Sequence, residues 1–320
     1  MPAPRDPDLL AKAARLYFLE DQSQNEIAAV LGTTRSNVSR MLRQARELGI
    51  VEIRIMSPAQ RDIDLEQAMR RRFGLAEARV LAVGPDTDVM SGVGRLAAGW
   101  LLETLGDDQV VALSWGGTLH AVVLAVDGAR QRNVEIVQLV GGLSALESQV
   151  TGQELVRELA ERMGAHHRYL HAPAVFGSAE AVRMMLREPA IADALAAAKA
   201  ADIALVGIGA RGFGSSAALI ENLALTDQER AQFEASAAVG DVCGRYFDLA
   251  GNETATVVAE RVLAVSLDDL RRIPTVVGVA AGPAKAPGIL GALRGQVVDV
   301  LVCDEAACRA VLGLDERTAA

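Results

Sequence analysis

Apolar residues recur at helical spacing near the start of the chain and in short strand-like runs farther on. An apolar stripe over 8–19 predicts a first helix. A second apolar set has the spacing of two short packed helices and consists of Ile27, Leu31, Val38, Met41 and Leu42. From residue 79 onward, near-continuous apolar runs alternate with longer helical patterns. The chain is therefore expected to begin with a small helical domain and to continue as an α/β domain.

The segment 23–48 has the pattern of a helix-turn-helix. Ser23 and Glu26 have the spacing of a capping box, which predicts a helix start. Ala28 is small where two helices must approach, and Gly32 follows at the turn, where a left-handed backbone costs little. Gly49 is expected to end the second helix.

The outer face of the second helix is polar and basic. Four arginines and no acidic residue lie between residues 27 and 46. In helix-turn-helix proteins the second helix enters the major groove, where arginine and asparagine read bases. A solvated basic face is the alternative, but the joint spacing of Ala28, Gly32 and Val38 favours DNA binding. The predicted DNA-binding residues are Gln24, Thr34, Arg35, Ser36, Asn37, Ser39, Arg40 and Arg43.

The boundary between the two domains is expected near residue 56. The alternating run Ile50–Ile55 predicts a short strand, which would make the first domain winged-helix-like, and Ser57-Pro58 marks a break. A helix over 62–73 ends in three arginines and reads as a linker helix. We therefore assign 1–56 to a DNA-binding domain and 57–320 to a linker helix followed by an effector-binding and oligomerisation domain.

The second domain shows the pattern of a doubly wound, mainly parallel sheet covered by helices on both faces. Its predicted strands are 80–83, 110–115, 134–140, 203–209, 275–280 and 297–303. Its predicted helices include 90–105, 119–126, 152–163, 179–186 and 284–293. Ligands bind such sheets beyond the C-terminal strand ends, so the loops there are the candidate site.

Those loops are rich in glycine. Ser114, Gly116, Gly117 and Thr118 follow one strand and open a helix, where backbone amides can bind an anion, while Trp115 can form a wall. The alternative is a tight turn without a ligand. Loops with Gly141, Gly142 and Pro173 follow two other strands. Gly207 and Gly209 begin a G-x-G-x-x-G pattern, but no acidic residue follows on a later strand, so no nicotinamide cofactor is expected.

Three charged residues complete the candidate site. Asp241 and Asp248 flank a segment of glycines and aromatics, where a carboxylate at a pocket rim can accept hydrogen bonds from sugar hydroxyls. Ordinary turn chemistry is the equal alternative for both. Lys285 is one of three lysines in the chain and lies in a Gly/Pro loop after a strand, where it can bind phosphate as a point charge.

Composition limits the remaining classes of function. The net charge of −9 argues against a protein that coats DNA non-specifically. Residues 1–56 nevertheless carry eight basic and seven acidic residues, so the acidic excess lies in the second domain. An odd cysteine count of three and the absence of a signal peptide or a long apolar run point to the cytoplasm and to no membrane partner. His167 and His171 are too far apart along a strand for easy chelation, so neither metal nor cofactor is expected.

The order of these motifs resembles the SorC family of bacterial transcriptional regulators nearly from end to end. The motifs are the helix-turn-helix, SWGGT at 114–118, VGIGA at 206–210, GDVCGRYFD at 240–248 and the run from 276 to 307. The resemblance implies an effector domain similar to sugar-phosphate isomerase and deaminase folds. It implies an effector bound near Ser114, Gly116, Gly117, Thr118, Gly207, Gly209, Asp241 and Lys285. Some members have a lysine after the strand equivalent to 134–140; this chain has none there, so no covalent sugar adduct is expected in that region.

The sequence therefore predicts a transcription regulator of a carbohydrate or polyol catabolic operon. Its expected partners are double-stranded operator DNA, a sugar, sugar-phosphate or polyol effector, and further copies of the chain in a homodimer or homotetramer. The alternative is a sugar-phosphate isomerase or deaminase on the same fold. Such an enzyme would need a general base, for which Asp241 and Asp248 are the candidates, and it would have no use for a helix-turn-helix.

Overall fold

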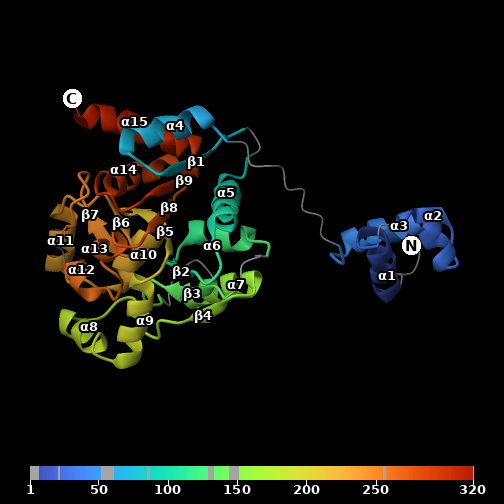
Figure 1. Cartoon of the computed structure of the whole chain (residues 1–320), viewed down its shortest axis with the longest axis horizontal. Coiled ribbons are helices and arrows are strands. Elements are labelled where there is room, and N and C mark those ends of the chain that lie inside the picture. Colours follow the sequence, from blue (N-terminus) through green and yellow to red (C-terminus); the bar gives the residue numbers. More distant parts are fainter. Residues whose placement is uncertain are drawn as a thin grey trace. The chain divides into compact units, whose positions relative to one another are not determined.

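A computed structural model describes residues 7–20, 22–51, 61–84, 87–128, 133–143, 151–254 and 257–319. The chain divides into two compact units, Met1–Pro58 and Ala59–Ala320 (Figure 1). Among the described residues, no helix is both long enough and apolar enough to cross a membrane.

The described residues of the first unit form three helices: α1 (Pro7–Phe18), α2 (Gln24–Val30) and α3 (Arg35–Glu47). Leu10, Ile27 and Val38 are fully buried between them. The predicted capping box is confirmed, because Ser23 Oγ accepts the Glu26 amide at 3.3 Å and Glu26 Oε2 accepts the Ser23 amide at 2.8 Å. Gly32 and Gly49 both have positive φ, as the two predicted turns require. The strand predicted at Ile50–Ile55 lies, from residue 52 onward, outside the described residues.

The second unit alternates helices and strands. Its strands are β1 (Glu77–Leu81), β2 (Val110–Leu113), β3 (Glu135–Gln138), β4 (His166–Arg168), β5 (Ile203–Ala210), β6 (Gly240–Val242), β7 (Arg245–Phe247), β8 (Thr275–Val279) and β9 (Val300–Asp304). Its helices are α4 (Ile63–Phe73), α5 (Val89–Thr104), α6 (Gly117–Ala125), α7 (Gly152–Met163), α8 (Ala179–Met185), α9 (Pro189–Lys199), α10 (Gly214–Asn222), α11 (Asp227–Ala235), α12 (Val257–Arg261), α13 (Leu267–Leu270), η1 (Pro283–Lys285), α14 (Ala286–Arg294) and α15 (Glu305–Ala319).

Seven strands form a parallel sheet in the order β1-β9-β8-β5-β2-β3-β4. After β2 the chain adds β3 and β4 on one side, and it then returns to place β5 on the other side of β2. The winding direction therefore reverses between β2 and β5, which is where open α/β sheets bind ligands. The predicted doubly wound, mainly parallel architecture is confirmed.

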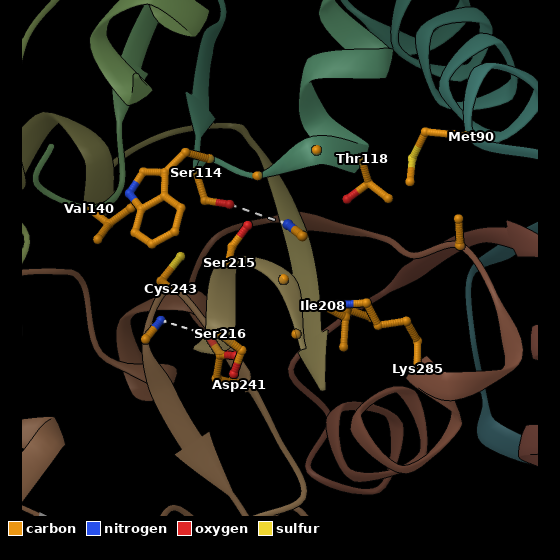
Figure 2. A pocket seen from close by; sticks show the side chains of 18 residues that line it. Met90, Ser114, Thr118, Val140, Ile208, Ser215, Ser216, Asp241, Cys243 and Lys285 are labelled. Carbon is orange, nitrogen blue, oxygen red and sulfur yellow. Dashed lines mark hydrogen bonds between the residues drawn. The ribbon is translucent and has the colours of Figure 1, made fainter. Parts of the chain in front are cut away.

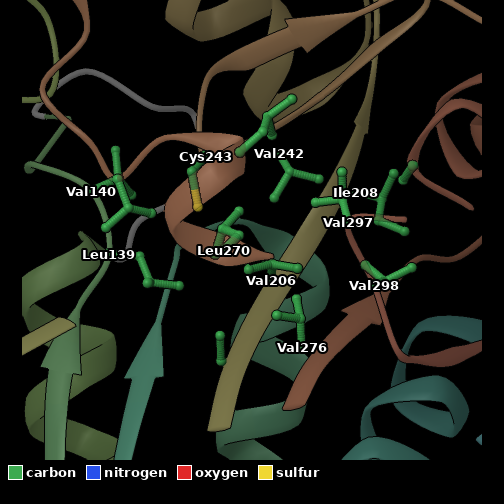
Figure 3. Close-up of a cluster of buried hydrophobic side chains, with 14 of the residues drawn as sticks. Leu139, Val140, Val206, Ile208, Val242, Cys243, Leu270, Val276, Val297 and Val298 are labelled. Atoms are coloured by element: carbon green, nitrogen blue, oxygen red, sulfur yellow. The ribbon is translucent and has the colours of Figure 1, made fainter. Parts of the chain in front are cut away.

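Helices cover both faces of this sheet. One buried cluster joins α5, α6 and α7 to the sheet, and another joins α9, α14 and α15 to its opposite face (Figure 1). Figure 3 shows part of the second cluster, with Val206, Ile208 and Val242 among its members. The apolar runs of the central strands are buried on both sides, which explains why they lack polar alternation.

Two strand predictions need correction. The strand predicted at 80–83 begins at Glu77, because Arg79 is neutralised by Glu77 at 2.8 Å and Glu103 at 2.6 Å, so charged residues fit in this edge strand. The segment 240–247, for which the sequence predicted no strand, forms the antiparallel hairpin β6–β7, and β6 pairs with the end of β5. Strands of three residues are too short to leave a periodic pattern in the sequence.

Candidate functional site

A pocket of about 200 Å³ lies where the C-terminal ends of β2 and β5 meet, at the reversal of winding direction (Figure 2). Four segments supply most of its lining: the β2–α6 loop, the end of β5 with the start of α10, the β6–β7 hairpin, and the loop that carries η1. Nine of the predicted effector-binding residues line it, namely Ser114, Trp115, Gly116, Gly117, Thr118, Gly207, Gly209, Asp241 and Lys285.

The β2–α6 loop brings backbone amides to the pocket. Ser114 Oγ accepts the amide of Gly207 at 3.2 Å, which ties this loop to β5. Gly116 has a φ of 133°, a conformation that favours glycine, and a Cβ there would lie 3.1 Å from Ser215 Oγ. No side chain caps the helix start at Gly116, so the first amides of α6 remain available to a ligand.

The end of β5 and the start of α10 supply a second set of donors. Helix α10 begins at Gly214, again without a side-chain cap, and Ser215 and Ser216 follow in its first turn. Gly209 allows β5 to approach the hairpin, since a Cβ there would lie 1.9 Å from Asp241 Oδ1. Two uncapped helix N-termini therefore open on one cavity, an arrangement that favours an anion.

Asp241 lies at the bottom of the pocket and is 8% exposed. Its Oδ2 accepts the amide of Gly244 at 3.1 Å, whereas its buried Oδ1 has no hydrogen-bond partner among the described residues. Burial raises the pKa of the Asp241 carboxyl, and the Ser216 hydroxyl, the Gly244 amide and the charge of Lys285 oppose that shift.

Lys285 is the single cation among the described residues that line the pocket. Figure 2 shows its side chain extending from η1 toward the middle of the cavity. Burial lowers the pKa of the Lys285 amine, and the charge of Asp241 acts in the opposite direction. The loop before it is held by Asp304, whose Oδ2 accepts the amide of Gly282 at 2.5 Å. The loop that carries Lys285 is therefore fixed, while its amine has no ion-pair partner among the described residues.

Four predicted residues lie outside this pocket. The Gly141 carbonyl accepts Trp115 Nε1 at 3.0 Å, so Gly141 supports a pocket residue without lining the cavity. Gly142 and Pro173 border a separate hollow beside the start of α7. The carboxylate of Asp248 accepts the amides of Ala250 and Asn252, each at 2.9 Å, and so serves a turn.

Sequence reasoning missed nine lining residues: Met90, Val140, Ile208, Gly214, Ser215, Ser216, Cys243, Gly244 and Ala281. The run GFGSS at 212–216, a glycine and serine cluster after a strand, is a signal that could have found the start of α10. Cys243 and Gly244 lie between Asp241 and Asp248, the two residues of this motif that the sequence marks as candidates. Nothing local marks Met90, Val140 or Ala281, because apolar residues of this kind fill any core.

In the first unit, Thr34 caps α3 by accepting the amide of Asn37 at 3.3 Å. Arg40 donates to Asn37 Oδ1 at 2.8 Å, and Asn37 Nδ2 donates to Thr33 Oγ1 at 3.0 Å. The predicted DNA-binding residues are either exposed (Thr34, Arg35, Ser36, Arg40, Arg43) or half-buried (Gln24, Asn37, Ser39). Val38, Met41 and Leu42 are buried on the other side of α3.

The described residues contain no group of three or more His, Cys, Asp or Glu side chains that could hold a metal ion. The polar groups in the pocket are backbone amides, hydroxyls, one amine and one carboxyl group. This set suits a small ligand that combines an anionic group with hydroxyls.

Known proteins share this architecture. Residues 57–313 match a family model described as "Putative sugar-binding domain". The chain is 34% identical to the deoxyribonucleoside regulator of Bacillus subtilis over 307 residues, which cover 95% of this chain and 97% of the relative. It is 30% identical to the sorbitol operon regulator of Klebsiella pneumoniae, with 93% and 95% covered.

The crystal structure of the full-length sorbitol operon regulator SorC from Klebsiella pneumoniae superposes with a TM-score of 0.74. The superposition covers 97% of this chain and 100% of that structure, at 29% sequence identity. Both the helix-turn-helix segment and the domain that holds the pocket thus fall within the matched length. The chain belongs to the SorC family of sugar-binding transcriptional regulators.

Proposed function

We propose that this chain regulates transcription of a carbohydrate or polyol catabolic operon and that a phosphorylated sugar, polyol or related metabolite controls its binding to operator DNA. The observation that carries the proposal is the convergence of two uncapped helix N-termini and Lys285 on one pocket. The names of the relatives, regulators of deoxyribonucleoside and sorbitol operons, support a sugar-type effector.

The phosphate is assigned to the amides at the starts of α6 and α10, with hydroxyls of Ser114, Thr118 and Ser215 nearby. Lys285 supplies the compensating charge. The carboxyl group of Asp241, which lines the pocket, then accepts a hydrogen bond from a hydroxyl of the sugar or polyol. A free sugar would leave the helix N-termini and Lys285 without a counter-charge, so the phosphorylated form is expected to bind more tightly.

A thermal-shift screen tests this assignment. Wild-type protein is expected to melt at a higher temperature with at least one of ribose 5-phosphate, 2-deoxyribose 5-phosphate, fructose 6-phosphate and glucitol 6-phosphate, and to respond less to the unphosphorylated parents. Lys285→Gln should weaken binding about tenfold or more, since a bond to a charged group contributes about 1.5–3 kcal/mol. Lys199→Gln is the matched control, because Lys199 pairs with Asp269 at 3.2 Å and does not line the pocket. No response to any phosphorylated compound would overturn the assignment.

The first unit is assigned to operator binding. Helix α3 would enter the major groove with Arg35, Ser36 and Asn37 at its N-terminal end and with Arg40 and Arg43 along its exposed side. The remaining members of this set, Gln24, Thr34 and Ser39, are assigned to phosphate contacts at the groove edge. Protein retained on duplexes selected from a random library would define the operator. Selection of no common sequence would contradict sequence-specific binding.

The proposed regulator acts in the cytoplasm as a homodimer or homotetramer. Symmetric copies would place two α3 helices on half-sites about one helical turn apart. An effector that prefers one arrangement of the subunits shifts the population toward it and so changes operator affinity. Titration of the selected duplex in the presence of the sugar phosphate that raises the melting temperature tests this link. Unchanged operator affinity would contradict control by that metabolite.

We assign the pocket to binding without turnover, which sets the isomerase or deaminase alternative aside. Asp241 is the remaining candidate base, since Asp248 lies outside the pocket. A general base acts best when its pKa lies near the working pH and its substrate lies within hydrogen-bond reach. Conversion of a sugar phosphate by the purified protein, abolished in Asp241→Asn, would restore the enzyme alternative.

A further inference from the structure

Strands β6 and β7 are joined by a two-residue turn made of Cys243 and Gly244. Both residues have positive φ, 53° and 72°, which is the pattern of a type I′ turn. Such turns favour asparagine, aspartate or glycine at the first central position. A cysteine there is therefore held in a backbone conformation that L side chains rarely adopt.

The side chain of Cys243 faces the pocket. Cys243 lines the pocket together with Asp241 and Gly244, and it also belongs to the buried cluster that contains Val242. Figure 2 shows the sulfur on the side of the cavity where Val140 lies, away from Lys285, and Trp115 lines the same cavity. Cys243 itself is 6% exposed.

A second feature of this pocket, independent of Cys243, points to a ligand. Asp241 Oδ1 is buried and has no hydrogen-bond partner among the described residues, although an unsatisfied carboxylate oxygen is costly inside a protein. Asp241 lines the same cavity and is 8% exposed, so a polar group of the ligand is the natural partner. A ligand that reaches Asp241 enters the space that Cys243 bounds.

We propose that Cys243 is a specificity-determining residue whose side chain, together with Trp115 and Val140, forms the inner wall of the pocket and sets the length of the sugar or polyol chain that fits. The inference rests on the proposed function, because it concerns the ligand of the same pocket. Turn formation alone does not explain a cysteine at this position, whereas a role in ligand selection does.

The thiol acts by shape and contact. Burial raises the pKa of Cys243 to about 12, so the group remains a protonated thiol at neutral pH and is a poor nucleophile. A glycine at this position removes two heavy atoms, Cβ and Sγ. The number of heavy atoms removed is the same as in the CHOH unit, one carbon and one oxygen, by which a six-carbon sugar phosphate exceeds a five-carbon one.

Two substitutions distinguish the effect of the Cys243 side chain on ligand binding from its effect on the turn. Glycine and asparagine both favour positive φ, so Cys243→Gly and Cys243→Asn are expected to keep the hairpin and to fold as the wild type does. Cys243→Gly should lengthen the cavity, and Cys243→Asn should shorten it with a polar amide. Cys308→Ala is the matched control, since Cys308 is also fully buried but does not line the pocket.

The measurement is isothermal titration of full-length protein with glycerol 3-phosphate, ribose 5-phosphate and fructose 6-phosphate. Cys243→Gly should shift the ratio of affinities at least tenfold toward the longer probe. Cys243→Asn should weaken the best wild-type probe at least tenfold and affect a shorter probe less. The melting temperature of each ligand-free variant, measured alongside, shows that it is folded.

The outcomes distinguish this inference from the proposed function. Wild-type protein that binds none of the three probes contradicts both. Wild-type protein that binds a probe, with unchanged ratios in both Cys243 variants, contradicts the inference alone. Equal loss of all affinities in both variants also contradicts it, because a purely structural role would weaken every probe alike. If only one of the two variants folds, the ratio of its probe affinities to each other, compared with the wild-type ratio, tests the inference.

Discussion

Asp241 carries a carboxyl group that folding removes almost completely from water. Its pKa in the folded protein lies above the ordinary value of 3.8, because burial penalises the charged form. The folded state therefore keeps this proton over a pH range in which the unfolded chain has already released it. The associated stability is present below about pH 3.8 and is lost as the pH rises through the folded-state pKa.

Asp241→Asn should become progressively more stable than the wild type as the pH rises above about 3.8 and through the pKa of the folded-state carboxyl group. Asparagine carries no charge at any of these pH values, and its Oδ1 can still accept the amide of Gly244. Thermal melts of the two proteins across this range provide the measurement, with Asp193→Asn on the exposed side of α9 as the control. A constant difference in melting temperature across the range would contradict the expectation.

On α3, Arg40 is exposed and already oriented by Asn37. Arg40→Ala should weaken binding to the selected operator about tenfold or more, since an arginine contact with a base contributes about 1–3 kcal/mol. Fluorescence anisotropy at several salt concentrations measures the change and shows whether a phosphate contact is lost. Arg157→Ala removes an exposed arginine from α7 and is the matched control. Equal operator affinity of Arg40→Ala and the wild type would show that the reading face lies elsewhere.

Among the elements, the pair α5 and α6 connects packing to the site, because α6 begins at the pocket. Gly94 of α5 packs directly on the backbone of α6, where an added Cβ would lie 2.5 Å from the Ala121 carbonyl oxygen. Gly99 lies on the same helix, but a Cβ there would meet only side-chain atoms at 3.8 Å or more. The two glycines therefore differ in what alanine would do.

Gly94→Ala should destabilise the protein by about 1–3 kcal/mol, because the two helices must separate. Gly99→Ala should instead stabilise it by up to about 1 kcal/mol, since alanine is the better helix former. Urea unfolding of both variants measures the free energies. The separation should also displace the start of α6 and reduce sugar-phosphate affinity in Gly94→Ala only. Equal stability of the two variants would contradict the close helix contact.

At this same scale, the sequence predicted what depends on local chemistry. The capping box at Ser23, the C-terminal glycine at Gly49 and helix α7 at 152–163 follow from side chains near in sequence. The β6–β7 hairpin was missed because each of its strands has only three residues and β6 joins the sheet through β5, some thirty residues away in the chain. Glycine loops revealed much of the candidate pocket, whereas Val140 and Met90 reach it through tertiary packing that no local pattern encodes.

For the whole molecule, the proposed assembly makes a size prediction. Sedimentation equilibrium should give a dimer or tetramer mass, and the operator selected in vitro should be near-palindromic, since symmetric subunits present the same helix to each half-site. Titration with the selected duplex should show that both half-sites are needed for tight binding. A monomer that binds a single asymmetric site with full affinity would contradict the proposed assembly.

The reversal of winding between β2 and β5 has a consequence for how the protein holds together. Residues 114–118, 207–216, 241–244 and 281–285 meet only because the sheet brings distant parts of the chain to one point. A ligand in this pocket therefore acts as a non-covalent cross-link that spans most of the second unit. Its binding energy should oppose global unfolding, so amide exchange should slow throughout the sheet and not only in the four loops.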